Sequence, residues 1–427
     1  MIPGDPRIHA IFLAILIGTQ AFFTALAIRN IRHSETMITA EESWLDAALD
    51  ISDPDAVIDY TRRRTGFSHL QSWVGLLILL LVLYSGLFTD AVLLVESLGF
   101  DPILGGTFFF VGLAVALQLY SIPFDLVDTF VIEEVFDFNQ QTVRLWIRDA
   151  IIGLLMTIVF TALLVGILLA IIEWFPMFWW VLGTIVFLAF SLIMLIVYPR
   201  VIAPLFNEFT PIESGELRDA VEAVFDRAGF RCDELYTMDA SRRSSHSNAY
   251  FVGFGRTKRV VLFDTLIEHM EIDEIQSVLA HELAHWQERH IWKRMVPTTI
   301  RTVLVLFVLW AILQSTWIYE LFALPYTATY AGLVIAILFV NPLMQFTAPI
   351  TNRQSLAHER EADRFAVEVM NDAEPMVGAL SGLAEENLAN PFPDPLYATF
   401  HYSHPPIPER IRRLREAADS MDESPSL

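Results

Sequence analysis

Seven apolar stretches constrain this chain more than any other feature, because a helix of such a stretch can cross the roughly 30 Å of hydrocarbon in a membrane. They lie near residues 10–28, 70–88, 103–121, 150–172, 177–198, 302–323 and 330–350. The chain has 427 residues, of which 54% are hydrophobic, and its mean hydropathy is +0.47. Soluble domains have lower values, so the sequence predicts a mainly α-helical, polytopic membrane protein with seven transmembrane helices.

The arginines between these stretches predict the orientation of the chain. Arg29, Arg32 and residues 62–64 follow the first stretch, Arg144 and Arg148 follow the third, and the fifth connection, about 200–300, is rich in arginine. The second, fourth and sixth connections carry no Arg or Lys. Basic connections face the cytoplasm. We therefore expect the N-terminus outside, and residues 200–300 and the C-terminal tail on the cytoplasmic side.

Two polar blocks are expected to form one α+β soluble domain that is interrupted by two spans. In this division residues 1–199 hold the first five spans with their loops, and residues 302–350 hold the last two. Residues 200–301 and 351–427 form the two parts of the domain. The expected elements are a helix over 212–228, a strand over 259–263, a helix with Asp273 as its N-cap, and a helix over 354–370. The net charge of −22 argues against a nucleic-acid partner.

The segment His281-Glu282-Leu283-Ala284-His285 carries the clearest chemical signal. On a helix, histidines four residues apart share one face, so two imidazoles can bind one zinc ion. Glu282 is then placed to take a proton from a water that the metal activates. The single cysteine, Cys232, excludes an internal disulfide and a cysteine-based zinc site. The motif predicts zinc-dependent hydrolysis of peptide bonds.

A catalytic zinc needs a third protein ligand, and the sequence offers Glu359. Asp363 follows four residues later, so one carboxylate can bind the metal while the other accepts a hydrogen bond from a ligand imidazole. The alternative interpretation is that Glu359 and Asp363 belong to a solvent-exposed acidic helix face and pair with arginines. Spacing alone also leaves His290, His358 and Asp264 as competing ligands.

Several further segments are similar to the signatures of one family. They are Phe130–Glu134, Phe138–Thr142, Pro204–Pro211, Asn248–Phe251, the HELAHW motif, the Glu359/Asp363 pair, and Ser403-His404-Pro405-Pro406 with Arg410. Their order resembles that of the CAAX prenyl protease type I family of integral-membrane zinc metallopeptidases. Two spans between the zinc motif and the third ligand are also typical of that family.

The resemblance implies seven helices that enclose a polar chamber, with a gluzincin-like cytoplasmic protease domain. Glu133 and Glu134, near a membrane boundary, would face that chamber. One Zn²⁺ would be held by His281, His285 and Glu359. The implied roles of the other residues are catalysis by Glu282 and His404, orientation of the site by Asp363 and Arg410, and substrate binding along an edge strand by Asn248, Ala249 and Tyr250.

One departure from the family concerns the residues after Ser355. The family usually has arginine soon after this serine, whereas this chain has Leu356 and Ala357. We expect Arg353 or Arg360 to substitute.

The sequence is compatible with three functions. The first is an endopeptidase that acts on C-terminally prenylated CAAX proteins at the lipid bilayer. The second is a membrane metalloprotease for quality control that has no prenyl requirement. The third is a non-enzymatic membrane scaffold, against which the intact ligand set and Glu282 argue.

Overall fold

Seven helices in the described part of the chain are long and apolar enough to cross a membrane, which confirms the predicted spans. The structure is a computed structural model that describes residues 3–231, 234–254 and 257–422. Cys232 lies outside these residues. The helices are α1 (Pro6–Ala40), α3 (Pro54–Tyr84), α5 (Pro102–Val127) with α6 (Glu133–Val135), α7 (Val143–Trp174), α8 (Trp179–Val197) with α9 (Ala203–Phe206), α13 (His290–Leu313), and α15 (Thr329–Met344) with α16 (Ala348–Met370).

Most of these helices extend well beyond the apolar stretch that predicted them. Three of them begin with the same local signal, an aspartate N-cap followed by proline, at Asp5, Asp53 and Asp101. The aspartate side chain accepts hydrogen bonds from the first free N–H groups, and proline has no N–H to leave unpaired. The predicted end of the sixth span at residue 323 is wrong. Helix α13 ends at Leu313, and a separate short helix, α14 (Trp317–Glu320), follows the polar residues 314–316.

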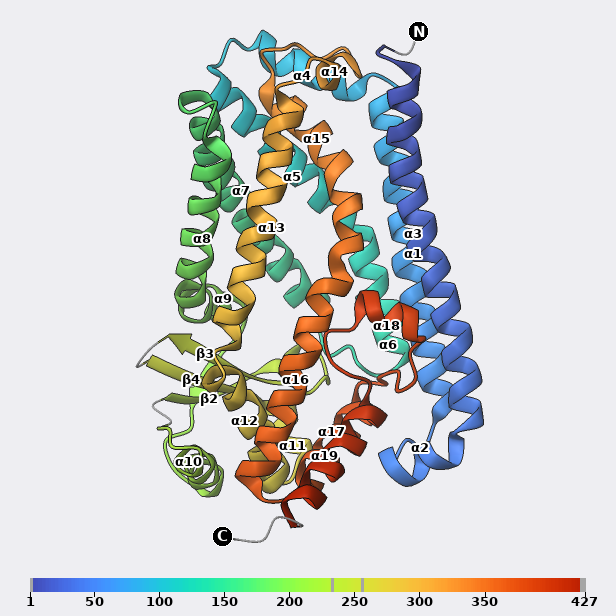
Figure 1. Cartoon of the computed structure of the whole chain (residues 1–427), viewed down its shortest axis with the longest axis vertical. Helices are drawn as coiled ribbons and strands as arrows, with labels where there is room; N and C mark the ends of the chain where they lie inside the picture. The colour runs from blue at the N-terminus through green and yellow to red at the C-terminus, as the bar shows by residue number, and fades with distance from the viewer. Residues whose placement is uncertain (1–2, 232–233, 255–256, 423–427) are drawn as a thin grey trace.

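The spans run roughly side by side, and α4 (Leu87–Ser97) and α14 lie together at one end of them (Figure 1). Their outward faces are apolar, and side chains such as Leu77, Leu117 and Val159 are 58–60% exposed. An apolar surface of this extent is unstable in water, and a bilayer covers it. Between the helices, Phe12, Trp179 and Tyr330 are among the largest fully buried side chains.

A four-stranded sheet with surrounding helices lies at the opposite end of the spans (Figure 1). The strand order is β1 (Phe209–Pro211), β2 (Glu234–Met238), β4 (Thr257–Phe263) and β3 (Ala249–Phe254). The β2–β4 pair is parallel, and the other two pairs are antiparallel. The accompanying helices are α10 (Glu216–Arg227), α11 (Asp264–His269), α12 (Ile272–Gln287), α17 (Glu374–Glu386), α18 (Pro395–His401) and α19 (Ile407–Asp422).

One hydrophobic core joins the sheet, α12, α17 and α19. It also takes in Leu45 and Leu49 of α2 (Glu42–Leu49), which connects the first two spans. The two polar blocks of the sequence therefore pack together, and the connection between α1 and α3 packs with them. The four-part domain division proposed from the sequence stays a prediction.

The starts of three predicted helices differ from the structure. The helix expected over 354–370 begins earlier, at Ala348, and ends at Met370 as predicted. The helix expected over 212–228 begins at Glu216, after Gly215. The predicted N-cap Asp273 is wrong, because Glu271 caps α12 and forms a reciprocal capping box with Glu274. The helix therefore starts at Ile272, and Asp273 lies inside its first turn. In contrast, the strand predicted over 259–263 is confirmed as part of β4, with α11 starting at Asp264.

Candidate active site

Helix α12 places the two motif histidines one turn apart at the edge of the protease core. Its other face carries Ile275, Leu279 and Leu283, which are buried against the sheet and α17 and so fix the rotation of the helix. His281 is buried, whereas His285 is half-buried. Their Nε2 atoms point toward one another and lie 3.3 Å apart. Neither imidazole therefore lies on a solvated helix face.

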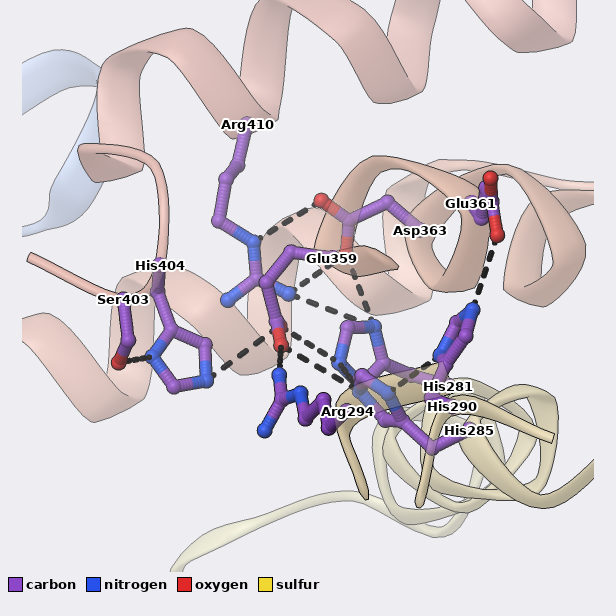
Figure 2. Close-up of polar contacts among 10 residues, drawn as sticks. All are labelled: His281, His285, His290, Arg294, Glu359, Glu361, Asp363, Ser403, His404 and Arg410. Carbon is purple, nitrogen blue, oxygen red and sulfur yellow. Dashed lines mark hydrogen bonds and ion pairs between the residues drawn. The ribbon is translucent and has the colours of Figure 1, made fainter. Parts of the chain in front are cut away.

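Helix α16 brings Glu359 to these two imidazoles across the two spans that separate them in sequence (Figure 2). Glu359 Oε2 lies 3.3 Å from His281 Nε2, and Glu359 Oε1 lies 3.5 Å from His285 Nε2. Tetrahedral zinc with ligand bonds of about 2.0–2.1 Å requires ligand atoms about 3.3–3.4 Å apart. The three side chains thus have the mutual spacing of ligands to one small metal ion.

The carboxylate of Glu359 also has the surroundings of a metal ligand. Its side chain is only 2% exposed, and Oε2 accepts no hydrogen bond from the residues that the structure describes. A buried carboxylate oxygen without a hydrogen bond is costly unless a cation binds it. His281, His285 and Glu359 form the candidate metal group that the described residues offer.

Glu282 lies in the same turn as His281, and burial raises the pKa of its carboxyl above the ordinary value. Burial, together with the nearby His281, lowers the pKa of His285 to about 3. The His285 imidazole is therefore neutral near pH 7, which is the form that binds metals.

Asp363 and Arg410 hold His281 from behind (Figure 2). Asp363 Oδ1 lies 2.9 Å from His281 Nδ1, and it accepts a 2.6 Å hydrogen bond from Arg410 Nη2. Arg410 Nε donates a second bond of 3.0 Å to Asp363 Oδ2. A carboxylate in this position can accept a hydrogen bond from Nδ1–H, which would leave the Nε2 lone pair for a metal.

His404 approaches Glu359 from the side opposite to α12 (Figure 2). It lies in the Ser403–Pro406 loop between α18 and α19, and the two prolines keep this loop out of both helices. His404 Nε2 is 3.3 Å from Glu359 Oε2, and its side chain is 61% exposed. His404 is thus beside the candidate metal group and remains open to an incoming ligand.

All three competing ligands make other contacts in the structure. His290 Nδ1 lies 2.9 Å from His285 Nδ1, and His290 Nε2 lies 2.9 Å from Glu361 Oε2. His290 therefore supports His285 from behind, as Asp363 supports His281. His358 stacks on His290, with their ring centroids 4.0 Å apart. Asp264 accepts hydrogen bonds from Ser241.

An arginine that sequence reasoning missed also approaches the group. Arg294 Nη2 lies 3.8 Å from Glu359 Oε1. Of the two arginines expected to replace the missing family arginine, Arg360 instead pairs with Glu409 at 2.9 Å. The only signal for Arg294 in the sequence is its place one turn after His290 on α13, which does not reveal that the α13 and α16 helices meet there.

The residues expected to bind substrate lie at the edge of the sheet. Asn248 precedes β3, and Ala249 and Tyr250 are its first two residues. In the described sheet β3 pairs with β4 alone, and β3 also contacts α12. The backbone of an edge strand is available to pair with an added peptide strand.

A cavity of about 660 Å³ opens beside the candidate metal group. Its wall includes His404 and Arg410 on one side, Asn248 near β3, and Tyr60 and Arg64 of α3. Glu133, expected in a polar chamber, lies next to this wall, where it accepts a 2.8 Å hydrogen bond from Tyr60. Pockets for small ligands commonly occupy about 300–1,000 Å³, so a short peptide fits such a space.

Comparison with known proteins agrees with this arrangement over both halves of the chain. Residues 211–418 match the model of peptidase family M48, and residues 43–208 match the CAAX prenyl protease N-terminal model, described as five membrane helices. The CAAX prenyl protease 1 homolog of Arabidopsis thaliana is 36% identical over 83% of this chain and 85% of its own length. CAAX prenyl protease 1 of Saccharomyces cerevisiae is 36% identical over 71% of each chain.

The chain belongs to peptidase family M48. Within it, the chain resembles the type I CAAX prenyl proteases, as the sequence motifs indicate. The crystal structure of S. mikatae Ste24p is similar in fold, with a TM-score of 0.85 and 30% identity, and the match covers 96% of this chain and 99% of that one.

Membership of the M48 family makes this chain an integral-membrane metalloendopeptidase, as predicted. The family relation implies a metal and a peptide or protein substrate. The identity of the metal, the roles of individual residues, the orientation of the chain and the prenyl group remain predictions.

Proposed function

We propose that this M48 protease uses one zinc ion, held by His281, His285 and Glu359, to cleave proteins near a prenylated CAAX C-terminus. The observation that carries the proposal is the spacing of 3.3–3.5 Å among the facing donor atoms of these three residues. It matches the edge of a zinc tetrahedron, and the buried Oε2 of Glu359 accepts no hydrogen bond from the described residues.

The surrounding residues divide the chemical steps between them. A zinc ion bound there would supply a Lewis acid that activates a water molecule and polarises the substrate carbonyl. Glu282 takes the proton from the attacking water and passes it to the departing amine. His404 donates a hydrogen bond to the carbonyl oxygen as that oxygen gains negative charge. Asp363 and Arg410 keep His281 in the correct tautomer throughout.

The substrate is positioned by the edge strand and the cavity. Asn248, Ala249 and Tyr250 are proposed to pair with the peptide backbone, which holds the scissile bond between His404 and α12. The choice of a CAAX-type substrate rests on the curated relatives, which carry that name at 30–38% identity. We further propose that the site faces the cytoplasm, with the N-terminus outside, because the arginine-rich connections lie on the side of the sheet.

A paired-substrate assay tests this function. One CAAX peptide is prepared with and without its prenyl group and incubated with the purified protein in detergent. We expect the prenylated peptide to have the higher kcat/KM, by at least about tenfold, and the Glu282→Gln variant to cleave neither peptide. Equal cleavage of both peptides would remove the prenyl requirement and favour a quality-control protease. Cleavage of neither by the intact protein would reject the proposed function.

A further inference from the structure

The cavity beside the candidate metal group is unusual in its charge. The whole chain has 50 acidic and 28 basic residues, yet no Asp or Glu is among the described residues that line this cavity. Two arginines and two histidines do line it: Arg64, Arg410, His401 and His404. Glu133 lies behind Arg64, and Asp363 is bonded to Arg410, but the lining itself offers guanidinium and imidazole N–H groups and no carboxylate among its described residues. Such a surface suits an anion, in an otherwise acidic protein.

We propose that this cavity binds the free C-terminal carboxylate of the substrate, and that Arg64 is the cation that anchors it. The proposal rests on the proposed function, because a CAAX sequence ends at the C-terminus of its protein. Cleavage near that end leaves the α-carboxylate on the short peptide that departs. Binding of the carboxylate at Arg64 would fix the distance between the cleaved bond and the C-terminus of the substrate.

Arg64 is singled out because other polar side chains of the wall are engaged elsewhere. Arg410 is buried and bonded twice to Asp363. The Asn387 amide bonds to His246 and to the backbone of Leu383, and Asn390 bonds to Ser34. These groups form part of the wall, but most of their hydrogen-bonding atoms are already paired within the protein.

The Arg64 guanidinium is held in place and still accessible. Nη1 donates a 2.6 Å hydrogen bond to the Tyr60 hydroxyl and lies 4.0 Å from Glu133 Oε1. Both contacts use the same nitrogen, whereas a guanidinium has five N–H donors. The side chain is 55% exposed. Glu133 is itself bonded to Tyr60 and His246, so it helps to hold Tyr60, the partner of Arg64, in place. Such a fixed fork suits a carboxylate, which it can bind through two parallel hydrogen bonds.

The cavity volume of about 660 Å³ has room for a peptide of about three residues. His404, on one wall, reaches the candidate metal group, and Arg64 belongs to α3 on another wall. Three extended residues span about 10 Å. The cavity wall also includes Leu380, Leu383 and Ile407, which are apolar and can contact aliphatic side chains of the departing peptide.

Free-acid and amidated forms of the same prenylated peptide test the anchor. The two forms differ by one negative charge at the C-terminus. We expect the intact protein to cleave the acid with at least about tenfold higher kcat/KM, and the difference to lie mainly in KM. In the Arg64→Ala variant the ratio of acid to amide should fall toward one, because only the acid loses a partner. Arg64→Lys should recover part of the preference, since it keeps the charge and loses the fork.

Arg63→Ala is the matched control. Arg63 is the next residue of α3, is similarly exposed, and pairs with Asp59 outside the cavity wall. This variant should keep the full preference for the acid. Thermal unfolding of all variants shows whether each is folded.

A binding measurement separates this inference from the proposed function. The tripeptide that corresponds to the last three residues is titrated into the protein as acid and as amide. Tighter binding of the acid, lost in Arg64→Ala and kept in Arg63→Ala, supports the anchor even where cleavage fails and the proposed function falls. Equal binding or cleavage of acid and amide by the intact protein, or an unchanged preference in Arg64→Ala, would overturn the anchor and leave the protease intact.

Discussion

The ligand imidazoles are oriented by different kinds of partner. His281 is held by Asp363, whose carboxylate is fixed in turn by the two bonds from Arg410. His285 is held by His290, which reaches the half-exposed Glu361. The first chain of contacts is buried, and the second leads to the protein surface. Contacts within the protein thus fix the orientation of both imidazoles.

Glu282 is the residue whose replacement separates metal binding from catalysis. We predict that Glu282→Gln keeps the bound metal and the fold, because Glu282 is not one of the three proposed ligands. Its activity should fall by at least about 10²-fold, since the amide cannot accept the proton from water. Metal content by elemental analysis and peptide cleavage are measured on the same sample. An active Glu282→Gln protein would contradict the assigned role.

Asp363 is predicted to act on metal affinity. Asp363→Asn removes the charge beside His281 and takes the carboxylate partner away from the buried Arg410. Loss of such a partner typically weakens metal binding by about 10–100-fold. Competition with a chelator gives the affinity, and Glu368→Gln is the control, because Glu368 lies on the same helix in an exposed pair with Arg364. Equal metal affinity in both variants would mean that Asp363 does not position the ligand.

The sequence predicted the participants of the site better than their contacts. The motif and its resemblance named His281, Glu282, His285, Glu359 and Asp363, because each lies at a fixed helical spacing. His290 was weighed as a ligand, whereas the structure places it behind His285. Arg294 was missed because its approach to Glu359 depends on where two helices meet.

At the scale of elements, close helix packing fixes α15, the membrane helix that leads into the helix carrying Glu359. Helix α15 leads through the short 3-10 turn Gln345–Thr347 directly into α16, so the packing of α15 bears on the site (Figure 1). Gly106 of α5 lies where α7 and α15 converge. A Cβ there would be 2.7 Å from Leu169 and 3.0 Å from Tyr330. Small residues permit such close approach of helices in membranes.

A pair of glycine replacements tests this packing. We predict that Gly106→Ala destabilises the protein by about 1–3 kcal/mol, as overpacking does in close-packed interiors. Gly112→Ala is the control on the same helix, because a Cβ at Gly112 meets no atom within 4 Å. Its effect should stay within about 1 kcal/mol. Thermal unfolding in detergent compares the two. Similar melting temperatures for both variants would show that Gly106 is not a packing constraint.

Hydropathy predicted the presence of every span but not its length. It reports only the part of a helix that lies in hydrocarbon, whereas α1 and α3 continue past the bilayer to enclose α2. The end of α13 at Leu313 was missed because residues 317–323 are, apart from Glu320, also apolar or aromatic. The misplaced N-cap of α12 has a similar cause. Glu271 and Asp273 are both acidic, and only the reciprocal bonds with Glu274 distinguish them.

At the scale of the whole molecule, the spans separate the two ends of the protein. The α4–α14 end and the sheet end are predicted to face opposite sides of the membrane (Figure 1). Single cysteines test this in a Cys232→Ser background. Gln314→Cys should react with a membrane-impermeant maleimide in intact cells, and Glu416→Cys should react only after lysis. Both positions are exposed on the protein. The reverse labelling pattern would invert the predicted orientation.

The central claim is that one zinc ion in the candidate metal group makes this membrane protein a protease. The most direct test strips the metal from the purified protein with a chelator and returns zinc in measured fractions. We predict that the stripped protein does not cleave the prenylated peptide, and that activity rises linearly and reaches its maximum at one zinc per chain. Activity in the metal-free protein, or failure of zinc to restore it while the fold is intact, would contradict the account.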